Sequence, residues 1–180
     1  MNFNARGDIT SLGGITIAYD AGGRHAGMTY SDGTTVTVAR DASGRVVART
    51  VDPAGAQPAS TTKFLHAGGS DSPWGSVSAA GELTRELSLP GGVSVEATSA
   101  GLSWSYPGIL GHSIATGGGT STGALRLYDP FGQPLDPTTR AIGTVASDDA
   151  GLNGQQTGWH QGGLKLAHTA GQVTIIEMGG

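Results

Sequence analysis

Any chemistry of this chain would rest mainly on its aspartates, because the sequence contains no cysteine. The lack of cysteine removes thiol catalysis, disulfides and cysteine-ligated zinc together. Two carboxylates held close together can act as general acid and base. Five aspartates are candidates for such a pair: Asp52, Asp129, Asp136, Asp148 and Asp149. Their contexts favour other roles, because the first two begin Asp-x-x-Gly turns, Asp136 precedes a proline, and the last two lie in a segment without periodicity.

The other reactive residue types form no recognisable constellation. The five histidines do not have the spacing of metal ligands. They are His25, His66, His112, His160 and His168. No Gly-x-Ser-x-Gly motif is present. The glycine-rich stretch 117–120 lacks the Gly-Lys-Ser/Thr ending of a phosphate-binding loop. We therefore expect no enzyme activity, no metal site and no cofactor.

The aspartates belong to a turn that recurs along the chain. Tyr19-Asp20 is followed by Gly23-Arg24, and Asp41 is followed by Gly44-Arg45, so the aspartate, glycine and arginine keep the same spacing in both copies. A further copy consists of Tyr128, Asp129 and Gly132, and Asp52 to Gly55 has the same Asp-x-x-Gly spacing. An aspartate at the first turn position accepts a backbone hydrogen bond from two residues on, and glycine at the fourth position tolerates a positive φ. The motif therefore predicts a repeated β-hairpin corner, although an ordinary antiparallel domain could reuse the same turn.

The strands between these turns favour an all-β fold. Glycine makes up 32 of 180 residues, and only 13% of the residues are charged. Roughly a dozen short apolar–polar alternations, spaced about 8–12 residues apart, predict an antiparallel sheet. The recurring turn has a period of about 20 residues, which is typical of repeat architectures. Residues 1–13 carry little pattern, and residues 15–18 are predicted as the first strand.

The charge and hydropathy of the chain argue against several kinds of partner. The formal net charge is −4, and the ten basic residues are scattered, so nucleic-acid binding is not expected. No apolar run approaches the length that a membrane-spanning helix needs, which argues against a membrane span. The first residues lack the apolar segment of a secretory signal.

The order of several motifs resembles the Rhs or YD-repeat family, which includes the teneurin-like proteins, and in particular its actinobacterial type. The resemblance runs from about residue 13 to the end of the chain. Besides the Tyr-Asp turns, it rests on blocks that follow one another along the chain: 71–74 (DSPW), 89–93 (LPGGV), 104–107 (WSYP), 125–134 (LRLYDPFGQP) and 158–164 (GWHQGGL) continuing through 177–179 (EMG). These blocks resemble the stretch just upstream of the Rhs-associated core.

The resemblance implies an antiparallel YD-repeat β-sheet that is a segment of a spiralling hollow shell. Such a shell encloses a variable C-terminal domain, often a toxin, and ends in a self-cleaving aspartate core. On this basis we expect a YD-repeat sheet in 1–133, an irregular connection in 134–160 and a terminal β-hairpin in 161–180 that leads toward an Rhs core absent from this sequence. The resemblance also implies a secreted or cell-surface location as part of a longer protein.

The expected function is therefore structural: a wall segment that helps to enclose and deliver a C-terminal, toxin-like cargo domain. Its partners would be the remainder of the same shell and that cargo. The alternative is a module that binds carbohydrate or a cell surface through exposed aromatic side chains. The candidates for such contacts are Trp74, Trp104, Tyr106 and Trp159. The same side chains could instead pack the wall, as largely buried tryptophans commonly do.

Overall fold

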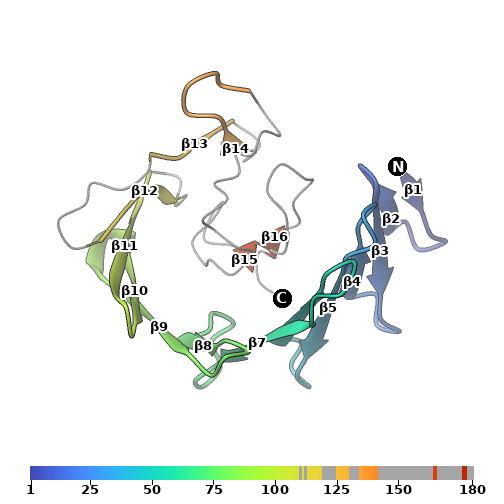
Figure 1. The fold of residues 1–180 in the computed structure, drawn as a ribbon, viewed down its shortest axis with the longest axis horizontal. Coiled ribbons are helices and arrows are strands. Elements are labelled where there is room, and N and C mark those ends of the chain that lie inside the picture. The colour runs from blue at the N-terminus through green and yellow to red at the C-terminus, as the bar shows by residue number, and fades with distance from the viewer. Residues whose placement is uncertain are drawn as a thin grey trace. The chain divides into compact units, whose positions relative to one another are not determined.

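The computed structural model describes residues 1–109, 111, 113–118, 125–129, 134–141, 164–165 and 176–177. Within these residues the regular structure is β-strand apart from one 3-10 turn, η1 (Pro90–Gly92) (Figure 1). Twelve strands form one sheet in which the spatial order follows the chain order, and the described pairings are antiparallel. The predicted all-β antiparallel class is confirmed. The chain divides into two compact units, Met1–Glu82 and Leu83–Gly180, which we call the N-terminal and C-terminal units.

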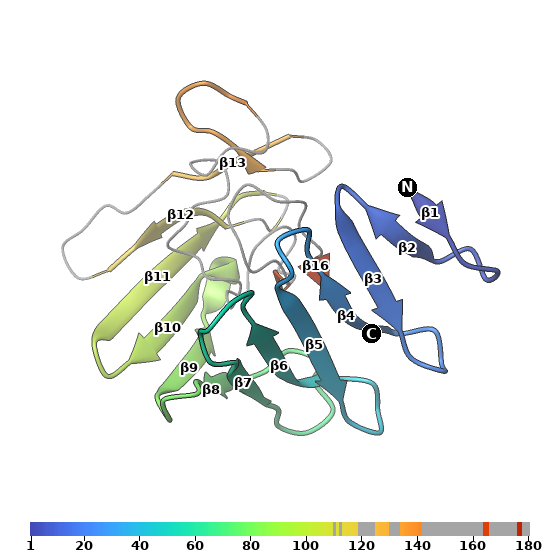
Figure 2. The same ribbon diagram turned by 45° about the vertical axis from the view of Figure 1, so that its right-hand side comes forward.

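The N-terminal unit is a run of hairpins. Its strands are β1 (Asn2–Phe3), β2 (Ile9–Leu12), β3 (Ile15–Tyr19), β4 (His25–Thr29), β5 (Thr35–Arg40), β6 (Val46–Asp52), β7 (Ser60–Leu65) and β8 (Gly75–Val77). Because each strand pairs with the next one along the chain, connections alternate between the two ends of the sheet. The turns that follow β1, β3 and β5 therefore lie at the same end, where Figure 2 shows them in succession.

One face of the sheet in the N-terminal unit carries buried apolar side chains. Ile17 pairs with Met28, Met28 with Val36, and Val36 with Val51, so one row of apolar side chains crosses four strands. Ile17 and Met28 are buried and Val36 has no exposed surface. The alternation of side chains along a strand places these residues on one face. Burying a side chain of this size contributes about 1.5–3 kcal/mol.

The other face of this unit is lined by threonines. Thr16, Thr29 and Thr35 form one cross-strand row. Thr37, Thr50 and Thr61 form a second row, in which the hydroxyls of Thr50 and Thr61 are hydrogen-bonded at 2.8 Å. Threonine is β-branched and polar, so it favours extended backbone while its hydroxyl faces water.

The C-terminal unit contains the remaining strands. They are β9 (Leu83–Ser88), β10 (Ser94–Thr98), β11 (Gly101–Pro107), β12 (Ser113–Gly117), β13 (Leu127–Tyr128), β14 (Pro134–Leu135), β15 (Leu164–Lys165) and β16 (Ile176–Glu177). β9 to β12 pair in sequence, whereas β13 pairs with β14 and β15 with β16. On one face Leu87, Val95 and Trp104 form a row across β9, β10 and β11. On the opposite face Glu86 lies directly across from Glu96.

Two local expectations were wrong. Residues 1–13 contain β1, β2 and a tight turn between them. The connection after β6 begins later than the Asp52 motif predicted, because β6 continues through Asp52, which pairs with Thr35. Much of the predicted connection 134–160 and hairpin 161–180 lies outside the described residues, so the division at residues 133 and 160 stays a prediction.

Candidate functional site

The predicted turn residues gather at one end of the N-terminal unit. Asp20, Gly23 and Arg24 connect β3 to β4, and Asp41, Gly44 and Arg45 connect β5 to β6. Of the downstream copy, Tyr128 and Asp129 are described and Gly132 lies outside the described residues.

The Asp41 turn shows how the motif works. The backbone N–H of Asp41 donates to the carbonyl of Arg45 at 2.9 Å, and that of Gly44 donates to the carbonyl of Asp41 at 3.0 Å. The Asp41 Oδ1 accepts from the N–H groups of Ser43 (2.9 Å) and Arg45 (3.0 Å). Gly44 has φ +95°, which only glycine adopts without strain. The arrangement is a type I turn closed by a left-handed residue and a bulge.

The Asp20 turn repeats this geometry. The N–H of Asp20 donates to the carbonyl of Arg24 at 2.9 Å, the Oδ1 of Asp20 accepts from the N–H of Arg24 at 2.9 Å, and Gly23 has φ +81°. The backbone N–H of Arg24 is the main group that lowers the pKa of the Asp20 carboxyl. At Asp41, the Ser43 hydroxyl and then the Arg45 side chain, whose Nε donates at 2.8 Å, hold the pKa well below its usual value.

Three further turns have the same backbone hydrogen bonds as the Asp20 and Asp41 turns. They lack the Asp-x-x-Gly motif, so the motif did not identify them. In each, the first residue donates to the carbonyl four residues on, and a glycine at the fourth position donates back to the first carbonyl. These turns are Asn4–Asp8, Tyr30–Thr34 and Ser78–Glu82. Their glycines, Gly7, Gly33 and Gly81, have φ of +90°, +91° and +82°. The usable signal was a glycine at the fourth position. Asn4 fills the place of aspartate because its Oδ1 accepts from the N–H of Arg6 at 2.9 Å.

The residue before the aspartate ties its strand to the preceding one. The Tyr19 hydroxyl donates to the carbonyl of Ile9 at 2.8 Å, and the Tyr128 hydroxyl donates to the carbonyl of Ser113 at 3.1 Å. Arg40, which stands where a tyrosine would stand in the second copy, donates through Nε to the carbonyl of His25 at 3.3 Å. Tyr19, Tyr128 and Arg40 therefore each link their strand to the preceding strand by a hydrogen bond to its backbone.

Arginines link each turn to the next. Arg6 in the first turn donates through Nη2 to the carbonyl of Ala21 at 3.2 Å, and a Cβ at Gly23 would lie 3.1 Å from Arg6 Nη1. The guanidinium of Arg24 lies against Gly44, where a Cβ would be 2.7 Å from Nη1. Arg45 donates to the carbonyl of Gly68 in the loop after β7 at 2.8 Å. We call this succession, from Asn4–Asp8 through Asp20–Arg24 and Asp41–Arg45 to the loop at Gly68, the turn ladder.

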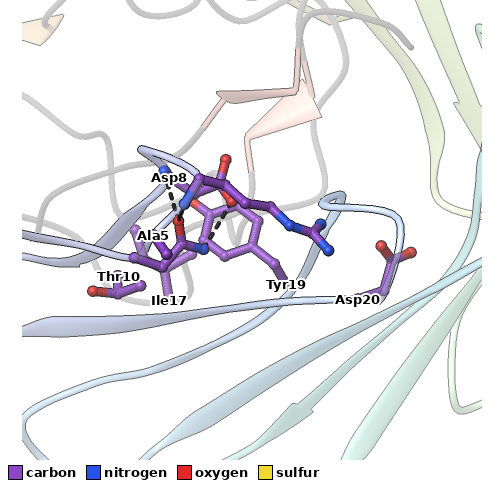
Figure 3. A pocket seen from close by; sticks show the side chains of 8 residues that line it. Ala5, Asp8, Thr10, Ile17, Tyr19 and Asp20 are labelled. Atoms are coloured by element: carbon purple, nitrogen blue, oxygen red, sulfur yellow. Dashed lines mark hydrogen bonds between the residues drawn. The ribbon is translucent and has the colours of Figure 1, made fainter.

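A hollow of about 400 Å³ lies beside the first step of the turn ladder (Figure 3). It is lined by Asn4, Ala5, Arg6, Asp8, Thr10, Ile17, Tyr19 and Asp20. Its polar side chains are engaged in the turns: Asn4 Nδ2 donates to Asp8 Oδ2 at 2.8 Å and Tyr19 donates to Ile9. Burial and the nearby Asp8 carboxylate raise the pKa of Tyr19. Tyr19 is thus held as a neutral hydrogen-bond donor, and the hollow offers neither a nucleophile paired with a base nor a free acid.

The remaining catalytic candidates are also engaged or lie elsewhere. Asp136 is buried and its Oδ1 accepts from the N–H groups of Thr138 (2.8 Å) and Thr139 (2.7 Å), which makes it a turn former. His25 packs edge-on against Tyr19, and His66 is hydrogen-bonded to the carbonyl of Val46 at 2.9 Å. Asp148, Asp149, His112, His160 and His168 lie outside the described residues. Across the described ranges, no cluster of three or more histidine, aspartate or glutamate side chains could hold a metal ion.

Each of the two units contains one buried arginine. Arg49 in β6 is 2% exposed, between its partners Val38 and Thr62, and burial lowers its pKa. In the C-terminal unit Arg126 is buried, and its Nη1 donates to the Ser113 hydroxyl at 3.3 Å. Burial raises the pKa of Glu96, and the charge of Arg126 opposes that rise. The sequence pattern predicted no special role for these charged residues.

The four candidate ligand-facing aromatics do not form one group. Trp74 ends the loop after β7 in the N-terminal unit and is 42% exposed. In the C-terminal unit Trp104 is half-buried and Tyr106, two residues along β11, is 45% exposed. Trp159 lies outside the described residues. Among the described residues no helix has the length and hydrophobicity needed to cross a bilayer.

No family model and no curated protein matches the chain. One solved structure that is similar in fold is the crystal structure of TcdB2-TccC3-TEV, with a TM-score of 0.52 at 13% sequence identity. The match covers 72% of this chain and 7% of that one, so this chain spans a small part of the protein it resembles. TcdB2-TccC3 is a Tc toxin component that contains an Rhs/YD shell. At this identity the likeness shows the fold alone, which agrees coarsely with the Rhs resemblance.

Replacing Gly44 by alanine should separate backbone strain from the arginine contact. Gly44→Ala and Gly55→Ala both force alanine to a positive φ, +95° and +101°, which costs about 1–2 kcal/mol. A Cβ at Gly55 meets no described atom within 4 Å, whereas one at Gly44 displaces Arg24. Urea unfolding should show an extra loss of about 0.5 kcal/mol or more for Gly44→Ala, which disappears when Arg24 is also alanine. Equal losses for the two variants would contradict the arginine contact.

Stability should depend on pH through Glu96. A carboxyl whose pKa is raised in the folded state stabilises the fold below its unfolded pKa, and this contribution is lost as the pH rises through the folded pKa. Glu96→Gln should therefore raise the melting temperature at about pH 7.5 more than at about pH 5. Glu82→Gln, at an exposed turn carboxyl, is the control and should change little. A Glu96→Gln effect that is the same at both pH values would refute this assignment. Arg126 is the charged group that acts on Glu96, and Glu86 faces Glu96 from β9.

Proposed function

We propose that the chain forms part of the wall of a hollow β-sheet shell of the Rhs/YD-repeat kind. The observation that carries this proposal is the turn ladder, in which the turns of the β1–β2, β3–β4 and β5–β6 hairpins share one geometry. An arginine of each turn lies against or donates to the next connection. Such a sheet grows by adding units at its edge, which is the property a long wall needs. The likeness in fold to TcdB2-TccC3-TEV supports the proposal.

The proposed mechanism is containment rather than turnover. The strands satisfy one another's backbone groups in continuous ladders, so a wall one sheet thick can stand between an inside and an outside. The cargo would be a C-terminal, toxin-like domain in the same longer protein, of the actinobacterial type that the motif order resembles. That protein would be secreted or displayed on the cell surface. Catalysis is not part of this role, and the aspartates serve as turn formers.

Protease protection of the gene's full-length product tests enclosure. A C-terminal domain held inside the shell should resist protease in the native protein and be cut after denaturation. Phe64→Ala should abolish the protection, because Phe64 is 5% exposed and its removal costs about 3–5 kcal/mol. Leu102→Ala is the control, since Leu102 is 52% exposed. Equal cutting of the native and denatured protein would refute enclosure.

A second candidate function is carbohydrate or cell-surface binding. It is favoured by the exposure of Trp74 and Tyr106, because aromatic rings that face water offer flat surfaces for ligands. A glycan array probed with the protein should then give a signal that Tyr106→Ala reduces and Phe3→Ala does not. The absence of any signal would remove this candidate.

A further inference from the structure

The turn ladder has an uncovered first step. The turn Asn4–Asp8 closes like the later turns, with the N–H of Asn4 bonded to the carbonyl of Asp8 at 3.0 Å and Gly7 at φ +90°. The equivalent glycines, Gly23 and Gly44, each have an arginine from the preceding turn against them. At Gly7 a Cβ would meet no atom within 4 Å among the described residues. The turn at Gly7 therefore has the glycine surface that an arginine contacts in the later turns, but no described side chain lies against it.

A second observation at the same edge points the same way. A register shift precedes the last residue pair in three of the hairpins. These pairs are Phe3–Ile9, Tyr19–His25 and Arg40–Val46. Phe3 therefore occupies the position that Tyr19 and Arg40 occupy in the later hairpins. Tyr19 and Arg40 reach back onto the preceding strand. Within the described part of the chain β1 pairs with β2 alone, and Phe3 and Met1 remain 56% and 70% exposed. An exposed edge strand with apolar side chains is a template for a further strand.

We propose that the β1 edge and the turn Asn4–Asp8 form a docking surface for one further β-hairpin that carries an arginine in its turn. The incoming arginine lies over Gly7, as Arg24 lies against Gly44. The incoming strand pairs with β1 and covers Phe3. The partner is a hairpin of this repeat type, because all three observed links of the turn ladder are made by an arginine: Arg6, Arg24 and Arg45.

The chain's own repeat supplies the test. A copy of residues 15–37 placed directly before Met1 sets its arginine as far ahead of Gly7 in the sequence as Arg24 is ahead of Gly44. The equivalent register follows, because Asn2 pairs with Ser11 as Ala39 pairs with Ala48. The extended and unextended chains are compared by hydrogen exchange and by urea unfolding. Gly7→Ala is made in both, and Gly81→Ala, at φ +82° and with open space around its Cβ, is the matched control.

Docking predicts three results. The extension slows exchange of the Asn2 and Phe3 amides about tenfold or more. Gly7→Ala lowers the urea midpoint of the extended chain by more than Gly81→Ala does, and of the unextended chain by no more than Gly81→Ala. In the extended chain, the larger effect of Gly7→Ala on the urea midpoint disappears when the arginine of the added copy is replaced by glutamine.

The other outcomes overturn the proposal. Unchanged exchange at β1 means that no hairpin docks there. Protection that is insensitive to Gly7→Ala and to the added arginine means that any strand suffices. A dimer of the unextended chain that Gly7→Ala abolishes assigns the edge to a second copy. The docking proposal rests on the proposed wall function. The two can be disproved independently, because the docking test involves no enclosed cargo.

Discussion

The N-terminal sheet depends on one backbone closure, in which a glycine at positive φ returns a hydrogen bond to the first carbonyl of a five-residue turn. This closure occurs at Gly7, Gly23, Gly33, Gly44 and Gly81. A left-handed residue followed by a bulge increases the twist of the hairpin it joins. Because these connections are tight, each of these strands pairs with the next in the chain, and the strand order follows from the turns.

The arginines convert separate hairpins into a linked series. In the N-terminal unit the turns at one end of the sheet are held by their neighbours. Arg6 and Arg45 donate to carbonyls in the next connection, and Arg24 lies against the next glycine. A planar guanidinium with several donors suits this role better than an ammonium group. The same polar groups are thereby engaged in holding the turns together.

Local rules predicted most of the strands after residue 13 and two of the turns. An aspartate and a glycine three residues apart are enough to specify the hydrogen-bonding pattern of such a turn. Local rules missed the turn at Asn4, where asparagine replaces aspartate, and they did not show that the turns at Tyr30 and Ser78 close in the same way as those at Asp20 and Asp41. The links between turns could not be predicted, since Arg24 and Gly44 meet only after two hairpins have formed. The burial of Arg49 and the facing pair Glu86–Glu96 depend in the same way on strand register and on what covers the sheet.

Cryo-electron microscopy of the gene's full-length product would test the central claim most directly. A wall segment predicts a β-sheet shell around a cavity, with the turns at Gly23 and Gly44 following one another along one rim of the sheet. A compact particle without a cavity, in which this sheet packs face to face against another domain, would contradict it.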